Sequence, residues 1–275
     1  MQLIKPNIGN YLSSLIAGGS QFRDLSTYCM FIGYPRSSHS LIGALLDAHP
    51  EMIIAHELNA LDFLKKGYSR KQIFHLLLRQ SKAFHDTQNE WMGYSYKVEG
   101  QWQGRYDKLK IIGDKRGGSS TALLKENPEL LDKIKSFCEK FKVLHVIRNP
   151  YDNITTMIKR KEKKRNTTFN EADLHRKIDH YFDKTAQIEK IKTQIPDNIL
   201  DIYIEIFIEN PKAELSRICE FLEVEVNEDY LSSCADIVFN KSRKTRHNID
   251  LWTSKNIEVV QKRIDQYDFL KHYSF

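Results

Sequence analysis

The clearest pattern of apolar and polar positions in this 275-residue chain lies between residues 28 and 46. An apolar run, Cys29–Ile32, precedes a polar turn, Tyr34–Ser40, and apolar residues then recur at helical spacing over Leu41–Leu46. This order predicts a strand, a loop and a helix. Peptide N–H groups at the start of a helix lack internal partners and carry the positive end of its dipole, so the loop is a candidate anion site.

The order of strand, polar loop and helix returns twice further along the chain. Leu109–Ile112 runs into the loop Gly113–Gly118, which opens a helix near Ser119 or Ser120. Lys142–Ile147, rich in β-branched residues, runs into Arg148-Asn149-Pro150, and proline suits the first turn of a helix. Three strands that end in loops opening helices predict an α/β fold. We expect a central, mainly parallel sheet flanked by helices, with the ligand at the carboxyl ends of the strands.

Shorter patterns predict the other elements. An irregular lead-in covers residues 1–27, and no internal repeat or low-complexity linker follows, so we expect a single domain over residues 1–275. Further strands are expected at Met52–Ala55, Tyr94–Val98 and Ile199–Ile208. Further helices are expected at Glu57–Lys66, Ser69–Phe84 with Ser69 as its cap, Pro128–Cys138, Ala172–Thr193, after Glu209-Asn210-Pro211, and Ser254–Tyr267.

Composition narrows the classes of partner. The net charge of +6 favours anionic ligands but is too small to imply a nucleic-acid coat. The four cysteines lie far apart without metal-ligand spacing, so we expect reduced thiols and no metal site. The short apolar patch Tyr11–Ala17 lacks the length of a signal peptide, and no stretch reaches the length of a membrane span. We therefore expect a soluble, cytoplasmic protein, unless an anchor has been trimmed, and the oligomeric state stays open.

The first polar loop departs from the phosphate loop of ATP-binding kinases. The pattern GxxxxGK[ST] needs glycine at position 38 and lysine at position 39, where this chain has Ser38 and His39. The lysine that neutralises the outer phosphates of ATP is therefore missing, which disfavours a kinase. Arg36, in the middle of the loop, is placed to clamp one phosphate or sulfate through paired hydrogen bonds. The alternative is an ordinary strand-to-helix turn with a surface arginine.

Two motifs carry a resemblance to a known family. Phe31–Pro50, FIGYPRSSHSLIGALLDAHP, resembles the 5′-phosphosulfate loop of sulfotransferases, and its LLDAHP ending is similar to the tyrosylprotein and related bacterial branches. Arg148-Asn149-Pro150, with Thr156 eight positions after the arginine, looks like that family's motif for a 3′-phosphate. The resemblance implies a P-loop-like three-layer fold and the cofactor 3′-phosphoadenosine 5′-phosphosulfate (PAPS), with 3′,5′-adenosine bisphosphate (PAP) as product.

The resemblance also assigns cofactor contacts. On the 5′ side it implies Arg36, Ser37, Ser38, His39, Ser40 and Leu41, and on the 3′ side Arg148 and Thr156. The loop Lys241, Ser242 and Arg243, with Trp252 downstream, resembles the basic segment that folds over the cofactor. Ser38 stands where the family has glycine, and its Cβ would block a close approach of phosphate to the backbone unless Ser38 takes the ordinary helical angles of the first turn. As an isolated residue, Thr156 has an alternative as a helix hydroxyl bonded to its own backbone.

Sulfuryl transfer needs a base for the acceptor hydroxyl and a cation at the leaving oxygen. Glu57 follows Arg36 by 21 residues, a spacing that resembles that of the catalytic glutamate in tyrosylprotein sulfotransferases, and we expect partial desolvation to raise its pKa. His56 is the rival base, and an N-terminal helix carboxylate is the alternative for Glu57. Arg36 and Lys115 are the candidate cations; an ion pair with Asp114 or another carboxylate is the alternative for Lys115.

These residues support a sulfotransferase acting on the hydroxyl of a small molecule, lipid or glycan. A kinase-like phosphotransferase, with Asp114 or Asp152 holding magnesium, is one alternative. The other is a nucleotide-binding module without catalysis, which a Glu57 pointing into the core and paired with arginine would favour. The basic run Lys159–Arg165 is either a solvated helix end or a rim that attracts an anionic acceptor. The aromatic stretch Trp91–Trp102 belongs either to an apolar core or to an acceptor pocket.

Overall fold

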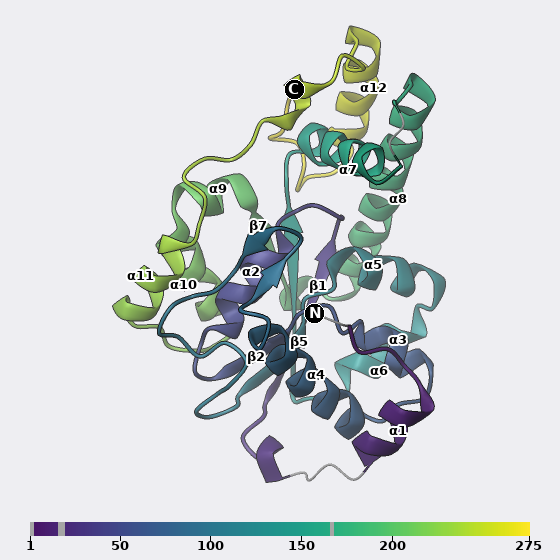
Figure 1. The fold of residues 1–275 in the computed structure, drawn as a ribbon. Coiled ribbons are helices and arrows are strands. Elements are labelled where there is room, and N and C mark those ends of the chain that lie inside the picture. Colours follow the sequence, from purple (N-terminus) through teal and green to yellow (C-terminus); the bar gives the residue numbers. More distant parts are fainter. Residues whose placement is uncertain (1–2, 16–19, 166–167) are drawn as a thin grey trace.

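The computed structural model describes residues 3–15, 20–165 and 168–275, without the side chains of residues 161–165. Its centre is a five-stranded sheet in the order β2-β5-β1-β6-β7, in which all neighbouring strands run parallel (Figure 1). The strands are β1 (Thr27–Gly33), β2 (Met52–Ala55), β5 (Ile111–Asp114), β6 (Lys140–Ile147) and β7 (Ile199–Tyr203). The parallel sheet expected from the sequence is therefore confirmed, and the polar loops after β1, β5 and β6 emerge at the same edge.

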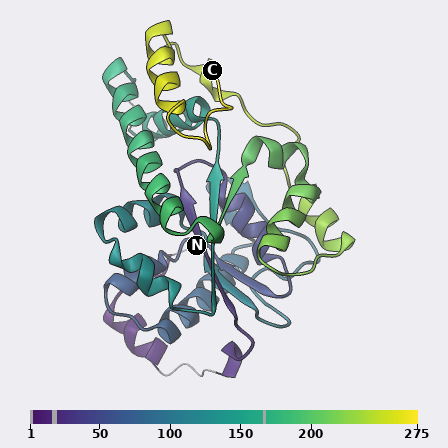
Figure 2. The ribbon, with the colours of Figure 1, turned by 180° about the vertical axis from the view of Figure 1, so that it is seen from behind.

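Alternating side chains of β1 pack into two separate hydrophobic cores, one on each face of the sheet. Tyr28, Met30 and Ile32 join the core on one face, whereas Cys29 and Phe31 join the other, and all five are at most 1% exposed. A strand buried on both faces is typical of a parallel sheet between two helical layers. The layers lie on opposite sides of the sheet in Figures 1 and 2. The three-layer α/β fold is thus confirmed.

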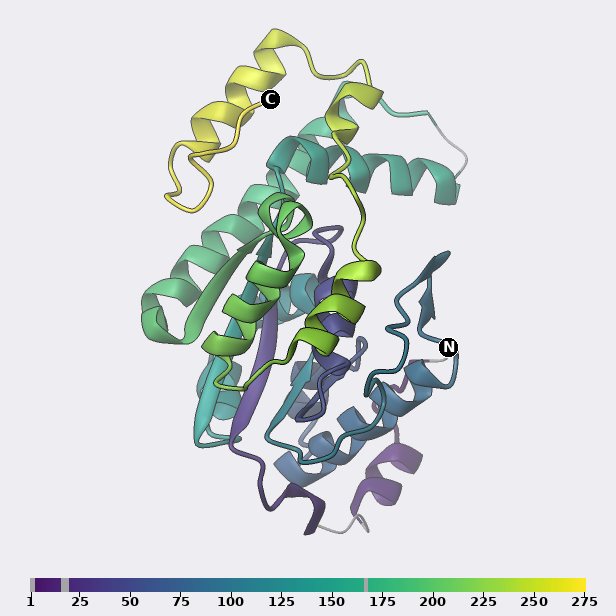
Figure 3. The same cartoon turned by 90° about the vertical axis from the view of Figure 1, so that its left-hand side faces the viewer.

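The helices divide between the two faces. The first face carries α4 (Arg70–His85), α5 (Gly117–Glu126), α6 (Glu129–Lys135) and α8 (Glu171–Gln194), and the second carries α2 (His39–Asp47), α9 (Ile204–Glu209), α10 (Pro211–Phe221) and α11 (Glu228–Asp236). The other elements are α1 (Ile8–Leu15), α3 (Ala60–Lys65), α7 (Pro150–Arg165), α12 (Ser254–Ile264), the hairpin β3 (Glu90–Trp91) and β4 (Tyr94–Ser95), and short helical turns at Ser20–Phe22, Pro196–Asn198 and Thr245–Asn248. In Figures 1 and 3, α7 and α12 lie beyond the carboxyl ends of the strands.

Two expected strands differ from the structure, and one helix was not expected. The last strand ends at Tyr203 rather than Ile208, because Ile204 and Phe207 are buried at helical spacing while Ile206 is 45% exposed, and a short apolar run does not separate the two periods. The region expected as a strand over Tyr94–Val98 contains only the two residues of β4. Helix α11 was not predicted. None of the helices in the described part of the chain is both long and apolar enough to cross a membrane.

The helix expected from Glu57 begins instead at Ala60. Glu57 and Asn59 have positive φ angles of 60° and 67°, which no α-helix contains. The buried carboxylate of Asp114, at the end of β5, accepts hydrogen bonds from the peptide N–H groups of Leu58 (3.0 Å) and Ala60 (2.7 Å). This tertiary contact fixes a tight loop before α3 and leaves Glu57 outside the helix.

Candidate active site

A cavity of about 640 Å³ lies at the carboxyl ends of the strands. The β1–α2 loop, the loop after β5, α7, α8, the hairpin β3–β4 and the segment 239–245 all contribute to its lining. Among the described residues in its lining, seven side chains are Lys or Arg and one is a carboxylate, Glu57. The cations are Arg36, Lys115, Arg116, Arg148, Lys184, Lys241 and Arg243. A cavity with this charge attracts anions.

The β1–α2 loop has an unusual backbone. Arg36 and Ser38 have φ angles of 73° and 65°, in the left-handed region where residues other than glycine are strained. Ser38 therefore does not take the helical angles that would remove the objection to its Cβ. Helix α2 begins after it, and the N–H groups of Leu41 and Ile42 donate to its carbonyl (3.0 and 3.3 Å). The strain is stored in the loop that faces the cavity, as is common at ligand sites.

The six residues expected on the 5′ side separate into two sets. Arg36, Ser38, His39 and Ser40 line the cavity. Ser37 and Leu41 lie beneath it: the Ser37 hydroxyl accepts from the side-chain amide of Asn153 (2.7 Å), and Leu41 is 3% exposed. Ser37 therefore fastens the loop to α7 and does not face the cavity.

His39, at the position of the kinase lysine, is not a cation in this loop. Its Nε2 lies 3.1 Å from the carbonyl of Ile32, and burial lowers its pKa to about 4. The positive charge beside the loop belongs instead to Lys115, which directly follows β5. Its Nζ donates to the hydroxyl of Ser40 (2.8 Å). Gly43 of α2 makes this approach possible: a Cβ there would lie 2.5 Å from Lys115 Cγ.

Glu57 lies against two of the cations. Its carboxylate accepts from Lys115 Nζ (3.0 Å) and from Arg116 Nη1. Burial alone would raise the pKa of Glu57, but Lys115 and Arg116 together outweigh burial and lower it, so the expected rise is contradicted. Lys115 thus pairs with Glu57 and not with Asp114. Glu57 pairs with an arginine but faces the cavity and not the core.

The rival base, His56, does not reach the cavity. It is 3% exposed, and its ring stacks on Phe84 with 3.9 Å between centroids and meets the edge of Trp91 at 5.0 Å. Burial, followed by the nearby charges of Lys115 and Arg116, lowers the pKa of His56 to about 2. A proton on this imidazole would be strongly disfavoured, which suits a core residue better than a base.

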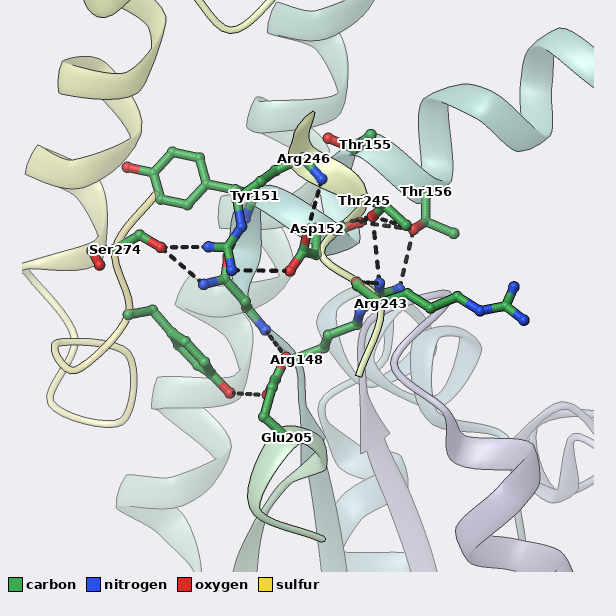
Figure 4. Close-up of polar contacts among 12 residues, drawn as sticks. Arg148, Tyr151, Asp152, Thr155, Thr156, Glu205, Arg243, Thr245, Arg246 and Ser274 are labelled. Carbon is green, nitrogen blue, oxygen red and sulfur yellow. Dashed lines mark hydrogen bonds and ion pairs between the residues drawn. The ribbon is translucent and has the colours of Figure 1, made fainter. Parts of the chain in front are cut away.

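Arg148 and Thr156 converge, as their spacing predicts (Figure 4). Arg148 Nη1 donates to Thr156 Oγ1 (3.1 Å), and the hydroxyl in turn donates to the carbonyl of Asp152 (2.8 Å). Both interpretations of Thr156 therefore hold: it bonds to its own helix and also faces the arginine. Arg148 Nη2 donates to the carbonyl of Arg243 (2.8 Å), so the segment 241–245 lies over this pair.

The segment after residue 240 is fastened mainly by Asp152, a residue the sequence analysis assigned only to the kinase alternative. The Asp152 carboxylate accepts from the N–H of Arg246 (2.8 Å) and forms an ion pair with its guanidinium (3.4 Å), and its carbonyl accepts from Thr245 Oγ1 (3.0 Å) (Figure 4). Trp252 Nε1 donates to Thr155 Oγ1 (2.8 Å), which holds the chain further along. Asp152 therefore serves as a structural clamp.

Comparison with known proteins gives the family. The family model described as "Sulfotransferase family" matches residues 30–228. No curated protein sequence matches the chain. Among solved structures, the fold is similar to the sulfotransferase domain from the curacin biosynthetic pathway (TM-score 0.57, 15% identity, covering 88% of this chain and 97% of that one). It is also similar to the sulfotransferase domain from the Synechococcus PCC 7002 olefin synthase (0.54, 17%, 98% and 99%) and to a mouse sulfotransferase complexed with PAP (0.53, 14%, 94% and 89%). The family model covers well over half of the chain, and the protein therefore belongs to the sulfotransferase family.

Proposed function

We propose that this protein transfers a sulfuryl group from PAPS to a hydroxyl of a small-molecule, lipid or glycan acceptor, and that residues 1–275 form a single domain for this reaction. One observation carries the proposal: a single cavity joins the strained loop at Arg36, the pair Arg148–Thr156 and the pair Lys115–Glu57. A cavity with seven cations and one carboxylate fits a ligand that has phosphates at two ends. The similar fold of a mouse sulfotransferase complexed with PAP supports the same cofactor.

The residues of this cavity divide into two binding ends. Arg36, Ser38, His39 and Ser40 would hold the 5′-phosphosulfate, together with the ammonium of Lys115. Arg148 and Thr156 would hold the 3′-phosphate, with Lys241, Ser242 and Arg243 above them. Bound PAPS would supply the sulfuryl group. The guanidinium of Arg36 offers paired hydrogen bonds to one anionic group, whereas Lys115 offers a compact charge for the oxygen that leaves.

Glu57 is the proposed general base. It is the one carboxylate among the described residues that line the cavity, and its lowered pKa keeps it ionised and able to accept a proton at neutral pH. The acceptor oxygen would form the new bond to sulfur as its proton passes to Glu57, and the electron pair of the broken bond would leave with PAP. Lys115 contacts both the base and Ser40, so it orients the carboxylate and faces the phosphate loop at once.

The alternatives fit this cavity less well. The magnesium-holding acids of a phosphotransferase would be Asp114 and Asp152, but the first caps the loop before α3 and the second clamps Arg246. A calorimetric titration separates the two chemistries. We expect PAP to bind in the absence of magnesium and Mg-ATP to bind more weakly. A preference for Mg-ATP would contradict the proposal. If PAP binds and Glu57→Ala transfers the sulfuryl group at the wild-type rate, the cofactor assignment stands and Glu57 is rejected as the base.

A further inference from the structure

Part of the lining of the active-site cavity is not used by the proposed cofactor contacts. It comprises the start of α5, including Gly118 and Ser119, and Lys184 of α8. A chain of contacts connects it to the proposed base: Glu57 pairs with Arg116, and Arg116 Nε donates to Ser119 Oγ (3.1 Å). An acceptor with its hydroxyl at Glu57 would therefore extend along this part of the lining.

Lys184 is the unexplained residue there. Its side chain lines the cavity, yet the residue is only 7% exposed, and its Nζ donates to the carbonyl of Gly118 (2.9 Å). Within the described part of the chain, no carboxylate lies at ion-pair distance from it, because the neighbouring Asp183 pairs with Lys125 on the surface. Burial lowers the pKa of Lys184. A buried ammonium with one neutral partner is costly, and an anion in the cavity would complete its hydrogen bonds.

Two further guanidinium groups meet at Met92, a residue of the cavity lining. Arg36 Nη1 and Arg160 Nη2 both donate to the thioether sulfur of Met92, at 3.4 and 3.2 Å. A thioether is a weak acceptor, so the two guanidinium groups retain most of their capacity to bind an anion. Arg160 belongs to the basic run Lys159–Arg165, and its side chain lies at the hairpin that borders the cavity. This arrangement supports an entrance that attracts anions rather than a purely solvated helix end.

The charges exceed what the cofactor requires. Its two phosphate ends would engage Arg36, Lys115 and Arg148, with Lys241 and Arg243 above them, and Glu57 already balances Arg116. Lys184 has no ion-pair partner among the described residues, since Asp183 and Glu126 attract its ammonium only from beyond ion-pair distance. Because this lysine is buried within the cavity, an anion that meets it must enter the space shared with the nucleotide, which favours a compact acceptor.

We propose that the acceptor is a small hydroxyl compound that carries a carboxylate or another anionic group, and that Lys184 binds this group while Glu57 faces the hydroxyl. This inference rests on the proposed sulfuryl transfer and adds the class of acceptor. Lys184 is then a specificity-determining residue.

A matched pair of phenols tests the inference. Sulfuryl transfer from radiolabelled PAPS is measured with para-hydroxyphenylacetate, which is anionic, and with para-hydroxyphenylacetamide, its neutral analogue. We expect kcat/KM to favour the anion by about tenfold to hundredfold, the range of one hydrogen bond between charged groups. Lys184→Met keeps approximately the length of the side chain. It should remove this preference by lowering kcat/KM for the anionic phenol alone. The kcat/KM for the amide and the affinity for PAP should stay at wild-type values, and the melting temperature should not fall, because the variant removes a buried ammonium.

Two further variants sharpen the test. Lys125→Met removes an exposed lysine between the same two helices and should keep the wild-type preference. Lys184→Glu should shift the preference to tyramine, which is cationic. Equal kcat/KM for both phenols in the wild type, turnover of neither, or an equal loss of both in Lys184→Met would overturn the inference. Failure to bind PAP in calorimetry would instead overturn the proposed function itself.

Discussion

Replacement of Glu57 by glutamine gives the strongest test of the catalytic arrangement. The substitution keeps the size of the side chain but removes the negative charge that Lys115 Nζ meets at 3.0 Å and that also pairs with Arg116. Lys115 is only 2% exposed, so it would be left as a buried cation with neutral partners, the hydroxyl of Ser40 and the amide oxygen of the new glutamine. Two effects follow: a loss of stability in the free enzyme, and a loss of the proton acceptor.

The stability effect can be worked from the geometry. Unit charges 3.0 Å apart attract by about 5 kcal/mol at an effective dielectric constant of about 20. Glu57 is 23% exposed and the cavity admits water, so desolvation and screening offset about half of this, leaving about 2–3 kcal/mol. For a chain of this size the melting temperature should fall by about 5 °C. Added PAP should narrow the difference from wild type, because its phosphate would replace the lost charge beside Lys115.

The catalytic effect is separable from the stability effect. With radiolabelled PAPS and a phenolic acceptor, kcat should fall by about a hundredfold to ten-thousandfold, the range for loss of a general base. Glu51→Gln is the matched control. Glu51 is about as exposed as Glu57, but its partner Lys110 (2.6 Å) has a side chain that is 38% exposed and stays solvated, so this pair contributes under about 1 kcal/mol. An unchanged kcat would reject Glu57 as the base. An unchanged melting temperature would reject the ion pair as a stabilising contact.

The lowered pKa of Glu57 determines how activity should change with pH. Because the folded-state pKa lies below its ordinary value of 4.5, the carboxylate and its ion pair persist above pH 4.5 and are lost only as the pH falls through that lowered pKa. The acid limb of kcat/KM should therefore lie below pH 4.5. In the complex with PAPS, Lys115 would meet a competing anion, so the limb of kcat should move to higher pH. A limb near pH 6.5 in both profiles would indicate a histidine base instead.

Three further substitutions examine the loop, the lysine and the 3′ end. Ser38→Gly relieves a φ of 65° but adds freedom to the unfolded chain, so urea unfolding should show a net gain of no more than about 1 kcal/mol; a loss would contradict the strain. Gly43→Ala places a Cβ 2.5 Å from Lys115 Cγ, so sulfuryl transfer should drop while far-ultraviolet circular dichroism stays native. Thr156→Val removes one hydrogen-bond partner of Arg148 and should weaken calorimetric PAP binding about three- to tenfold, whereas Thr156→Ser should retain it.

Much of the fold and part of the site follow from local sequence. Strands β1, β5 and β6 were predictable because each is a short apolar run before a polar loop, and parallel strands bring such loops to one edge. The convergence of Arg148 and Thr156 was predictable for the same reason, since it depends on one strand end and two turns of one helix. The change from strand to helix within Ile199–Ile208 was not predictable, because a short apolar run is compatible with either element.

The loop before α3 shows why other parts of the site were beyond sequence patterns. Asp114 lies 56 residues after Leu58, yet its carboxylate bonds to the Leu58 N–H and so sets the backbone that presents Glu57. Nothing near Glu57 in the sequence marks this contact. The direction of the pKa shift of Glu57 was predicted wrongly for the same reason. The burial of its carboxylate was expected, but Lys115 and Arg116, which follow β5 in the chain, outweigh burial and lower the pKa.

The position of the cation in the phosphate loop connects these observations. A kinase-type loop carries its lysine within the loop, but here that position holds a buried histidine whose imidazole bonds to the backbone of β1. The ammonium comes instead from Lys115, directly after β5 and against Gly43, and it contacts both Ser40 of the loop and Glu57, the proposed base. In the proposed reaction, one charge would therefore act on both the donor and the acceptor. An anion that binds in the loop would compete with Glu57 for Lys115, so cofactor binding itself would free the carboxylate and raise its basicity where the acceptor proton must be taken.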